Sequence, residues 1–195
     1  RGTGLISPLF SDNGIGERAV LTLFNIILDG GGAAKKSKSS LISLSYLAIE
    51  EGPVLSNNHT TGDGGAISIN MGGSMKGGEI HHNVAERGGA INVAGVDSPS
   101  FTMKSGSIHD NEATYGGAVY CGIDMAALVF IDGTIFHNTA QIDGGALYIA
   151  RDASTALKGG RIYGKTASKR GNGIIAEVGE GIDIHLSGSI RMEGD

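Results

Sequence analysis

Gly64-Gly65-Ala66-Ile67 is the stretch that decides the fold, because its first three residues return along the chain at a nearly constant spacing. Three further copies and one degenerate copy follow it: Gly88-Gly89-Ala90, Gly116-Gly117-Ala118, Gly144-Gly145-Ala146 and Gly171-Asn172-Gly173. A sequence that repeats itself at a fixed period is typical of a solenoid, in which each repeat stacks on the next. The chain therefore predicts stacked coils with a period of roughly 24–28 residues.

A second motif, Gly-x-Ile-x-x-Asn, repeats between the copies of the first. It reads Gly78-Glu-Ile80-His-His-Asn83, and related copies end at Asn57, Asn111 and Asn138. The asparagines keep the period of the first motif, and Gly160-Arg-Ile162 and Gly188-Ser-Ile190 continue the pattern without asparagine. Together the two motifs predict six or seven coils.

Each period holds three short, apolar, strand-like segments separated by turn residues, a pattern that excludes a helical repeat. Alternate side chains of a strand face the same way, so the segments predict inward columns. Two of these columns are Ile67, Ile91, Val119 and Leu147 after Gly-Gly, and Val54, Ile80, Ile108 and Ile135 in the second motif. We therefore predict an all-β chain folded as a right-handed parallel β-helix, a single-stranded solenoid with three short strands per coil. The right hand is the one preferred by parallel crossovers.

The composition fits one domain over residues 1–195 with no nucleic-acid partner, because the net charge of −5 leaves no clustered basic face for phosphates. Residues 1–20 depart from the repeat and are expected to form an incomplete coil or a cap, and residues 33–40 a solvated basic loop. The single cysteine, Cys121, lies at an apolar repeat position and is expected to be buried. We expect no membrane insertion by this segment, since no apolar run is long enough. The first residue, Arg1, suggests a fragment of a larger protein.

Two polar columns test the alignment of the coils. The residues before Gly-Gly include Asp63 beside Arg87 and Asp143 beside Arg170, so neighbouring coils are expected to form ion pairs. The asparagines of the second motif are expected to form a structural ladder at a corner, where asparagine tolerates left-handed backbone and bonds to neighbouring amides. The ladder members are Asn57, Asn83, Asn111 and Asn138.

An acidic column is a candidate ligand site. Its members, Asp97, Asp124, Asp152 and Glu180, recur at the period of the repeat, in the loops after the first strand. Carboxylates one coil apart repel each other unless a cation lies between them, so the column is suited to Ca²⁺ or a cationic ligand. Aspartate is also a common turn residue, and the calcium-binding nonapeptide of the Gly-Gly-x-Gly-x-Asp type is absent. No other cofactor is expected.

Two further clusters of side chains are weighed as sites. His82, Asp110 and His137 are equivalent in the repeat, but His82 and His137 lie two coils apart, so no metal site is predicted. Tyr120 and Tyr148 are expected to lie side by side on neighbouring strands. They offer either a flat platform for a sugar or a cross-strand pair that only stabilises the sheet.

Apolar residues near the C-terminus predict an exposed strip. Ile182, Ile184 and Leu186 alternate one place out of step with the earlier second-segment strands, which indicates a bulge or exposed apolar side chains. In that register Val129 and Ile184 share one outward column, and Ile131 and Leu186 share the next. Large exposed apolar patches usually contact a partner, so we expect the chain either to cover this strip with its own terminal residues or to self-associate through Val129, Ile184 and Leu186.

The repeats resemble those of the polymorphic outer-membrane proteins, which carry Gly-Gly-Ala-Ile and Phe-x-x-Asn. The first motif stands here as Gly64-Gly65-Ala66-Ile67 and Gly88-Gly89-Ala90-Ile91, while the second has Val54, Ile80, Ile108 and Ile135 in place of phenylalanine. The repeats also resemble the glycine-rich coils of large surface proteins of anaerobic gut bacteria. The resemblance covers about residues 20–176 and implies a secreted or surface-displayed bacterial adhesin.

From this resemblance we expect a non-enzymatic adhesin or stalk module, extracellular or on the bacterial cell surface, whose partner is a host or cell-surface protein or a glycan. The alternative is a carbohydrate-active β-helix enzyme, similar to a polysaccharide lyase or a glycoside hydrolase. Such enzymes need two carboxylates, or a base beside a basic residue, in a cleft, and the loops here are short. A deep groove with converging acidic and basic residues would favour the enzyme, and an even cylinder would favour the stalk.

Overall fold

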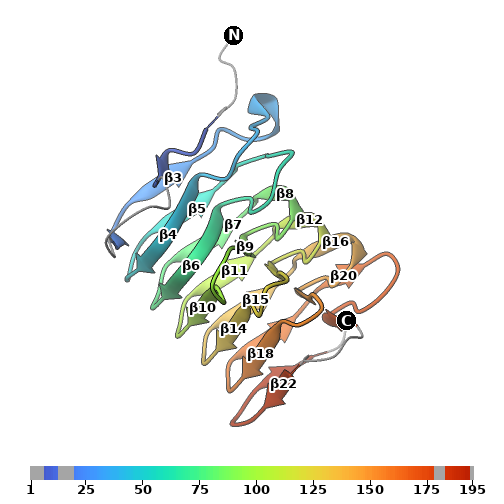
Figure 1. Ribbon diagram of the computed structural model, residues 1–195. Coiled ribbons are helices and arrows are strands. Elements are labelled where there is room, and N and C mark those ends of the chain that lie inside the picture. Colours follow the sequence, from blue (N-terminus) through green and yellow to red (C-terminus); the bar gives the residue numbers. More distant parts are fainter. Residues whose placement is uncertain (1–6, 13–19, 178–182, 194–195) are drawn as a thin grey trace.

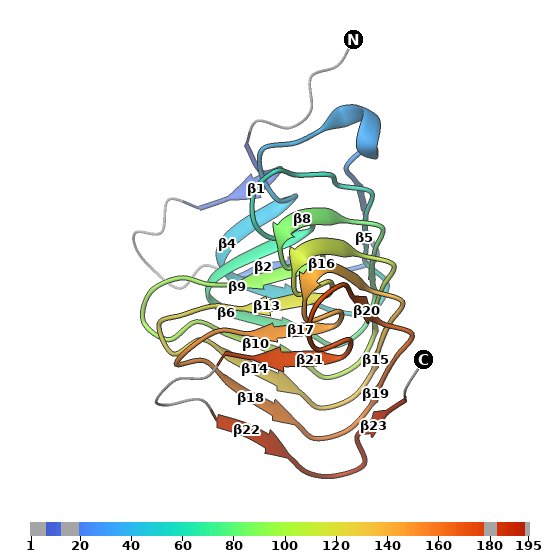
Figure 2. The ribbon, with the colours of Figure 1, turned by 90° about the vertical axis from the view of Figure 1, so that its right-hand side faces the viewer.

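The computed structural model describes residues 7–12, 20–177 and 183–193, and it is a right-handed parallel β-helix (Figures 1 and 2). The coils stack from the blue N-terminal end to the red C-terminal end in Figure 1, and Figure 2 looks obliquely along the stack. Every strand pair of the described residues is parallel, and each strand lies beside its copy in a neighbouring coil. The fold class predicted from the repeat is confirmed.

The first sheet has twelve strands and contains the first and second segments of each coil. In two early coils these segments form one long strand, β4 (Ile42–Ile49) and β6 (Ile67–Met75). In the other coils they are separate strands: β1 (Phe10–Ser11) and β2 (Leu21–Leu23), β9 (Ile91–Val93) and β10 (Ser100–Met103), β13 (Val119–Cys121) and β14 (Ala127–Phe130), β17 (Leu147–Ile149) and β18 (Ser154–Leu157), β21 (Ile174–Ala176) and β22 (Asp183–Leu186). The inward column predicted after Gly-Gly is confirmed, since Ile67 lies beside Ile91 and Val119 beside Leu147.

The second motif forms a second sheet of seven strands. They are β3 (Ile27–Asp29), β5 (Val54–Ser56), β7 (Glu79–His81), β11 (Ser107–His109), β15 (Thr134–Phe136), β19 (Arg161–Tyr163) and β23 (Arg191–Met192). Ile108 lies between Ile80 and Ile135 in the inward column of this sheet, and its side chain is 1 % exposed.

A third sheet of four short strands adds a fourth strand to the central coils, one more than the sequence predicted. The strands are β8 (Val84–Arg87), β12 (Glu112–Tyr115), β16 (Thr139–Asp143) and β20 (Thr166–Ala167). The inward residues of this sheet include Ala85, Ala113 and Ala140, all buried. Because alanine fills little space and gives no apolar run, the sequence pattern carried no strand signal here.

The Gly-Gly-Ala turn connects the third sheet to the first, and the structure explains why the motif repeats. Gly88 has a φ of 64°, a left-handed conformation in which glycine has no Cβ clash. A Cβ on Gly89 would lie 2.2 Å from the carbonyl oxygen of Gly117, so only glycine lets the neighbouring coils come this close. Ala90 is completely buried. The turn is therefore sharp, and Figure 2 shows β16 and β20 folded back above β17 and β21.

The register of the second sheet differs from the prediction at the first copy of the motif. Val54 lies beside Glu79 and Leu55 beside Ile80, so Leu55, and not Val54, faces the core. Leu55 is completely buried, whereas Val54 is partly exposed. The prediction followed the spacing of the motif glycines, but the spacing between the paired strand residues is shorter by one position. The same offset moves the first member of the asparagine ladder by one position.

The core between the sheets is almost entirely aliphatic, with Phe101 and Phe130 as its largest side chains. Burial of one such side chain stabilises the fold by about 1.5–3 kcal/mol. Cys121 is completely buried among them, as predicted. Burial raises the pKa of its thiol to about 12, so the thiol stays protonated and unreactive at neutral pH.

At the N-terminal end, β1 pairs with β4. The incomplete coil or cap expected for residues 1–20 stays a prediction, because residues 1–6 and 13–19 lie outside the described residues. The predicted loop over 33–40 contains a short 3-10 helix, Ala33–Lys35, and Ser37 bridges to Thr60. Among the residues described, no helix has the length and apolar character needed to cross a bilayer.

At the C-terminal end, the predicted shift of one place is wrong. Ile184 lies beside Thr155 and Leu186 beside Leu157, without interruption of the register. Both side chains therefore continue inward columns of the first sheet, rather than the outward column of Val129. They are 40 % and 58 % exposed because no later coil of the described residues covers them. Ile182 lies outside the described residues.

Candidate functional site

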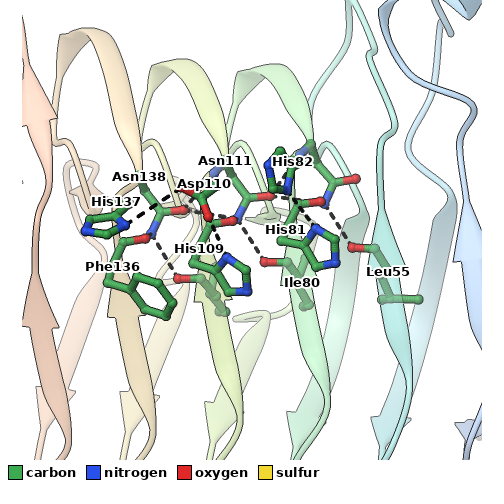
Figure 3. Close-up of polar contacts among 12 residues, drawn as sticks. Leu55, Ile80, His81, His82, His109, Asp110, Asn111, Phe136, His137 and Asn138 are labelled. Atoms are coloured by element: carbon green, nitrogen blue, oxygen red, sulfur yellow. Dashed lines mark hydrogen bonds and ion pairs between the residues drawn. The ribbon is translucent and has the colours of Figure 1, made fainter.

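A buried ladder of asparagine side chains joins the coils at the corner between the second and third sheets (Figure 3). Asn111 Oδ1 accepts hydrogen bonds from the main-chain nitrogen and from Nδ2 of Asn83, each at 3.0 Å. Asn111 Nδ2 donates to the carbonyl oxygens of Ile80 at 3.0 Å and His109 at 2.8 Å. Asn138 accepts from Asn111 in the same way. These side chains are buried and bonded within the fold, so the ladder is structural.

Asn58, and not Asn57, begins this ladder. The main-chain N–H of Asn58 donates to Asn83 Oδ1 at 3.0 Å. At the other end Lys165 replaces asparagine, and its buried ammonium donates to the carbonyl oxygen of Glu193. The left-handed conformation predicted for the ladder belongs instead to the preceding position, which is occupied by Asn57, His82, Asp110 and His137, with φ between 51° and 57°.

A column of stacked rings runs along the outer face of the second sheet (Figure 3). His81 stacks on His109 with 5.1 Å between ring centroids, His109 stacks on Phe136 at 4.6 Å, and Phe136 stacks on Tyr163 at 5.2 Å. Burial lowers the pKa of His81, and the neighbouring His109 lowers it further. The column therefore behaves as cross-strand packing, of the kind that stabilises sheets without a ligand.

The histidines and aspartate of the left-handed corner pair with their neighbours. His81 Nδ1 lies 2.8 Å from His82 Nδ1, and His109 Nδ1 lies 2.7 Å from Asp110 Oδ2. His137 Nδ1 lies 3.9 Å from Asp110 Oδ1. Within the described part of the chain, no three His, Cys, Asp or Glu side chains are grouped so that they could hold a metal ion.

The acidic column lies at the tips of the exposed turns between the first and second segments. Asp97, Asp124 and Asp152 have φ values of 58°, 64° and 64°, and Glu180 lies outside the described residues. Aspartate is one of the few residues that adopts this left-handed conformation readily, so the turn geometry alone accounts for the three aspartates. Asp124 and Asp152 also line an open hollow of about 580 Å³ with the exposed Ile123 and Met125. Binding of Ca²⁺ at this column stays a prediction.

A polar groove of about 550 Å³ lies in the angle between the third and first sheets. We call it the tyrosine groove, and its lining residues are Arg87, Tyr115, Tyr120, Ile142, Asp143, Tyr148, Lys169, Arg170 and Glu177. Four of its residues form two pairs with a spacing of five positions in the sequence. Tyr115 and Asp143 lie before a Gly-Gly-Ala turn, and Tyr120 and Tyr148 lie after it. The sharp turn brings the two members of each pair to facing sides of the groove.

Tyr120 and Tyr148 are adjacent in register on β13 and β17, as predicted. Their rings stack with 5.1 Å between centroids and 12° between planes, and the edge of Tyr115 meets Tyr148 at 5.4 Å. Tyr148 is only 4 % exposed. The two rings face each other along the stack, as in a cross-strand pair that stabilises a sheet, and the alternative of a platform for a sugar stays a prediction.

Both ion pairs predicted beside the Gly-Gly turns are confirmed. Arg170 donates from Nε and Nη2 to the two carboxylate oxygens of Asp143, at 3.2 and 2.6 Å. Arg87 Nη1 lies 3.6 Å from Asp63 Oδ2. The guanidinium carbon of Arg87 also lies 5.5 Å from the ring centroid of Tyr120, so this arginine covers the free face of the tyrosine pair.

Glu177 and Lys169 are charged groove residues that no sequence motif indicated. The Tyr148 hydroxyl donates to Glu177 Oε1, and the main-chain N–H of Arg151 donates to Glu177 Oε2 at 3.4 Å. Lys169 lies exposed at the groove, and no carboxylate of the described residues is within ion-pair distance of it. Both residues belong to the least regular coil, where the Gly-Gly-Ala motif is degenerate, so no repeat marked them. The constant spacing across the turn could have indicated four of the other groove residues, Tyr115, Tyr120, Asp143 and Tyr148.

Three side chains of the groove, Asp143, Tyr120 and Tyr148, have pKa values shifted from their ordinary values. The hydrogen bonds from Arg170 lower the pKa of Asp143. Burial raises the pKa of Tyr120, and burial together with the hydrogen bond to Glu177 raises that of Tyr148. At neutral pH Asp143 is therefore ionised and both tyrosines are protonated. The ionised Asp143 and the two protonated tyrosines therefore offer fixed acceptors and donors to a ligand.

Comparison with known protein families gives a match to a repeat. Residues 54–70 match the model of the Chlamydia polymorphic membrane protein repeat, and this stretch includes Gly64-Gly65-Ala66-Ile67. No curated protein and no solved structure is significantly similar to the chain. Over the matched stretch the chain is similar to the polymorphic membrane protein repeat, which confirms the resemblance inferred from the two motifs.

Proposed function

We propose that this chain is a rigid, non-enzymatic adhesive module of a bacterial secreted or cell-surface protein, and that the tyrosine groove contacts its ligand. The observation that carries the proposal is the groove itself, where aromatic and charged side chains from several successive coils converge. Concave sites with a few fixed polar groups are the usual place for ligands. The match to a membrane-protein repeat supports display at a surface.

The rest of the coil stack supports a stalk. The aliphatic core runs through all the complete coils, and the asparagine ladder ties four of them together at one corner. In repeat proteins each coil contacts only its neighbours, so the length of the rod follows from the number of coils. A rod of this kind is suited to holding a groove away from a surface.

The groove also contains acidic and basic residues together, which is the observation that favours a second candidate, a carbohydrate-active enzyme. Asp143 and Glu177 are its carboxylates, and Arg87, Lys169 and Arg170 are its cations. Asp143 is already held in an ion pair at lowered pKa, and the pKa of each tyrosine moves away from the range of a base. These shifts support binding over proton transfer.

An array of glycans and of host and bacterial surface proteins, probed with the labelled chain, tests the proposal. We expect binding that the Tyr120→Ala variant weakens and that Thr102→Ala, a substitution on β10 outside the lining of the groove, does not. Binding unchanged by Tyr120→Ala, with both variants folded, would exclude the groove as the adhesive site. The array is also run with and without millimolar Ca²⁺ and with the Asp124→Asn variant. Binding that depends on Ca²⁺ or on Asp124 would be assigned to the acidic column and not to the groove.

A matched activity assay tests the enzyme. The chain is incubated with acidic and neutral polysaccharides, and new reducing ends and unsaturated products are measured. Cleavage by the unaltered chain that disappears in Asp143→Asn or Tyr148→Phe would replace the binding proposal with an enzymatic one. We expect no cleavage above the buffer control.

A further inference from the structure

We propose that the tyrosine groove takes an acidic oligosaccharide, with the anionic group of the sugar seated on Lys169 and Arg170. This inference rests on the proposed function of the groove as the ligand site. It adds the chemical class of the ligand and names the two residues that select it.

The lining of the groove does not share the negative charge of the whole chain. Its lining holds three cations, Arg87, Lys169 and Arg170, and two carboxylates, Asp143 and Glu177, which leaves one net positive charge. The chain as a whole carries −5. Asp63, 3.6 Å from Arg87, balances one of these cations, so the groove is close to neutral on an otherwise acidic protein, and an anionic ligand is repelled there less than on the remaining surface.

Arg170 has donors left for a ligand. Its Nε and Nη2 bind Asp143, but a guanidinium carries five N–H groups and Nη1 makes no hydrogen bond in the described residues. The side chain of Arg170 is 65 % exposed, whereas that of Asp143 is 2 % exposed. Asp143 therefore holds the inner edge of the Arg170 guanidinium, and the outer edge of the guanidinium faces the groove. An arginine held in this way binds an anion at a smaller entropic cost.

Lys169 supplies the second cation. It precedes Arg170 in the chain and lines the same groove, and it has no carboxylate within ion-pair distance in the described residues. An ammonium is a compact charge with three rotatable donors, so it can follow the position that the planar arginine sets for the anion. By contrast, Arg87 lies near Asp63 and over Tyr120, so it contributes less to a ligand.

The remaining lining fits a sugar rather than a simple anion. Tyr115 and Tyr120 add phenol groups, and Glu177 adds a carboxylate that already accepts from Tyr148. These groups match the donor and acceptor hydroxyls of a short oligosaccharide. Because the shared face of Tyr120 and Tyr148 is closed, ring stacking adds little, and charge must supply more of the affinity.

Calorimetry with three matched probes tests the inference. The first probe is a linear trisaccharide of uronic acid units, the second is the same trisaccharide with its carboxylates converted to methyl esters, and the third is a sulfated neutral trisaccharide. We expect the uronic acid probe to bind at least tenfold more tightly than its methyl ester. Lys169→Gln should weaken it about tenfold, as expected for loss of one charge-assisted contact, and Lys104→Gln, an exposed lysine on another face, should not. Raising the salt concentration should weaken the same complex.

The outcomes distinguish an error in the acidic class of the ligand from an error in the groove as the ligand site. Equal affinity for the uronic acid probe and its methyl ester, both reduced by Tyr120→Ala, would overturn the acidic class and keep the groove as the ligand site. If only the sulfated probe bound, the ligand would still be anionic, but its anionic group would not be a carboxylate. No binding of any probe, or binding unaffected by both Lys169→Gln and Tyr120→Ala, would overturn the inference outright.

Discussion

Arg170 and Asp143 form an ion pair in which one partner is 65 % exposed and the other is 2 % exposed. Arg170 makes two hydrogen bonds to the buried carboxylate and so lowers its pKa. Arg170→Gln therefore leaves a buried charge without its partner and should lower the melting temperature more than the Asp143→Asn, Arg170→Gln double variant does. Thermal unfolding of the four proteins of this cycle measures the coupling. Simple additivity of the two single variants would contradict it.

The same pair makes stability depend on acid pH. The folded pKa of Asp143 lies below its ordinary value of 3.8, so the stabilisation is present above that value and is lost as the pH falls through the lower, folded pKa. The melting temperature of the unaltered chain should therefore fall below about pH 4 more steeply than that of the Asp143→Asn variant. Parallel curves for the two proteins would show that the pair does not contribute.

Ile108 tests the inward column of the second sheet. It is 1 % exposed between Ile80 and Ile135, so Ile108→Ala should cost about 2–5 kcal/mol of the free energy of unfolding. Urea denaturation measures this change, and Val54→Ala is the matched control because Val54 faces outward in the observed register. A cost below about 1 kcal/mol for Ile108, on the scale of a surface change, would place its side chain outside the core.

Asn111 tests the ladder. Asn111→Ala removes the acceptor of the buried Asn83 main-chain N–H, which should cost about 1–3 kcal/mol. Asn57→Gly is the control, because Asn57 lies outside the ladder at a φ of 57° that glycine adopts freely. If Asn57→Gly destabilised the chain as much as Asn111→Ala, the predicted position of the ladder would be right and the observed one wrong.

Self-association is expected through the exposed edge of the last coil. Ile184 and Leu186 lie on β22, which among the described residues pairs with β18 alone, and unpaired edges with apolar residues favour contact with another chain. Leu186→Asp should therefore reduce the mass observed by light scattering at high concentration. Val129→Asp, on an outward column in mid-sheet, should change it less. A monomer at all concentrations would exclude this contact.

The fold could be predicted from the sequence because the features that determine the fold recur from repeat to repeat. Gly-Gly-Ala marks the sharp turn, and large aliphatic residues return at each inward position, so both could be read from spacing alone. The third sheet could not be predicted, since the inward residues it stacks include Ala85, Ala113 and Ala140. The register at Leu55 was also missed, because one coil is shorter between its paired strands than between its motif glycines.

The candidate site was predictable only in part, because it is made by two columns that look independent in the sequence. Asp143 and Arg170 belong to one column and Tyr120 and Tyr148 to another, and both columns are confirmed. What joins them is the angle of the turn, a three-dimensional property that spacing does not contain. Glu177 follows no repeat, so its contact with Tyr148 could be found only in the structure.

Lys165 ends the asparagine ladder, and this position has a mechanical consequence. Coils up to Asn138 are linked by side-chain amides as well as by sheet hydrogen bonds, whereas at Lys165 a lysine side chain that donates to the carbonyl oxygen of Glu193 takes the place of the amide. Tension applied at the C-terminal end should therefore peel the coil after Lys165 away first. Lys169, Arg170 and Glu177 all belong to it, so a pulled rod would release its ligand while most of its length stayed folded. Force spectroscopy on ligand-bound chain would detect that release as a step before the main unfolding event.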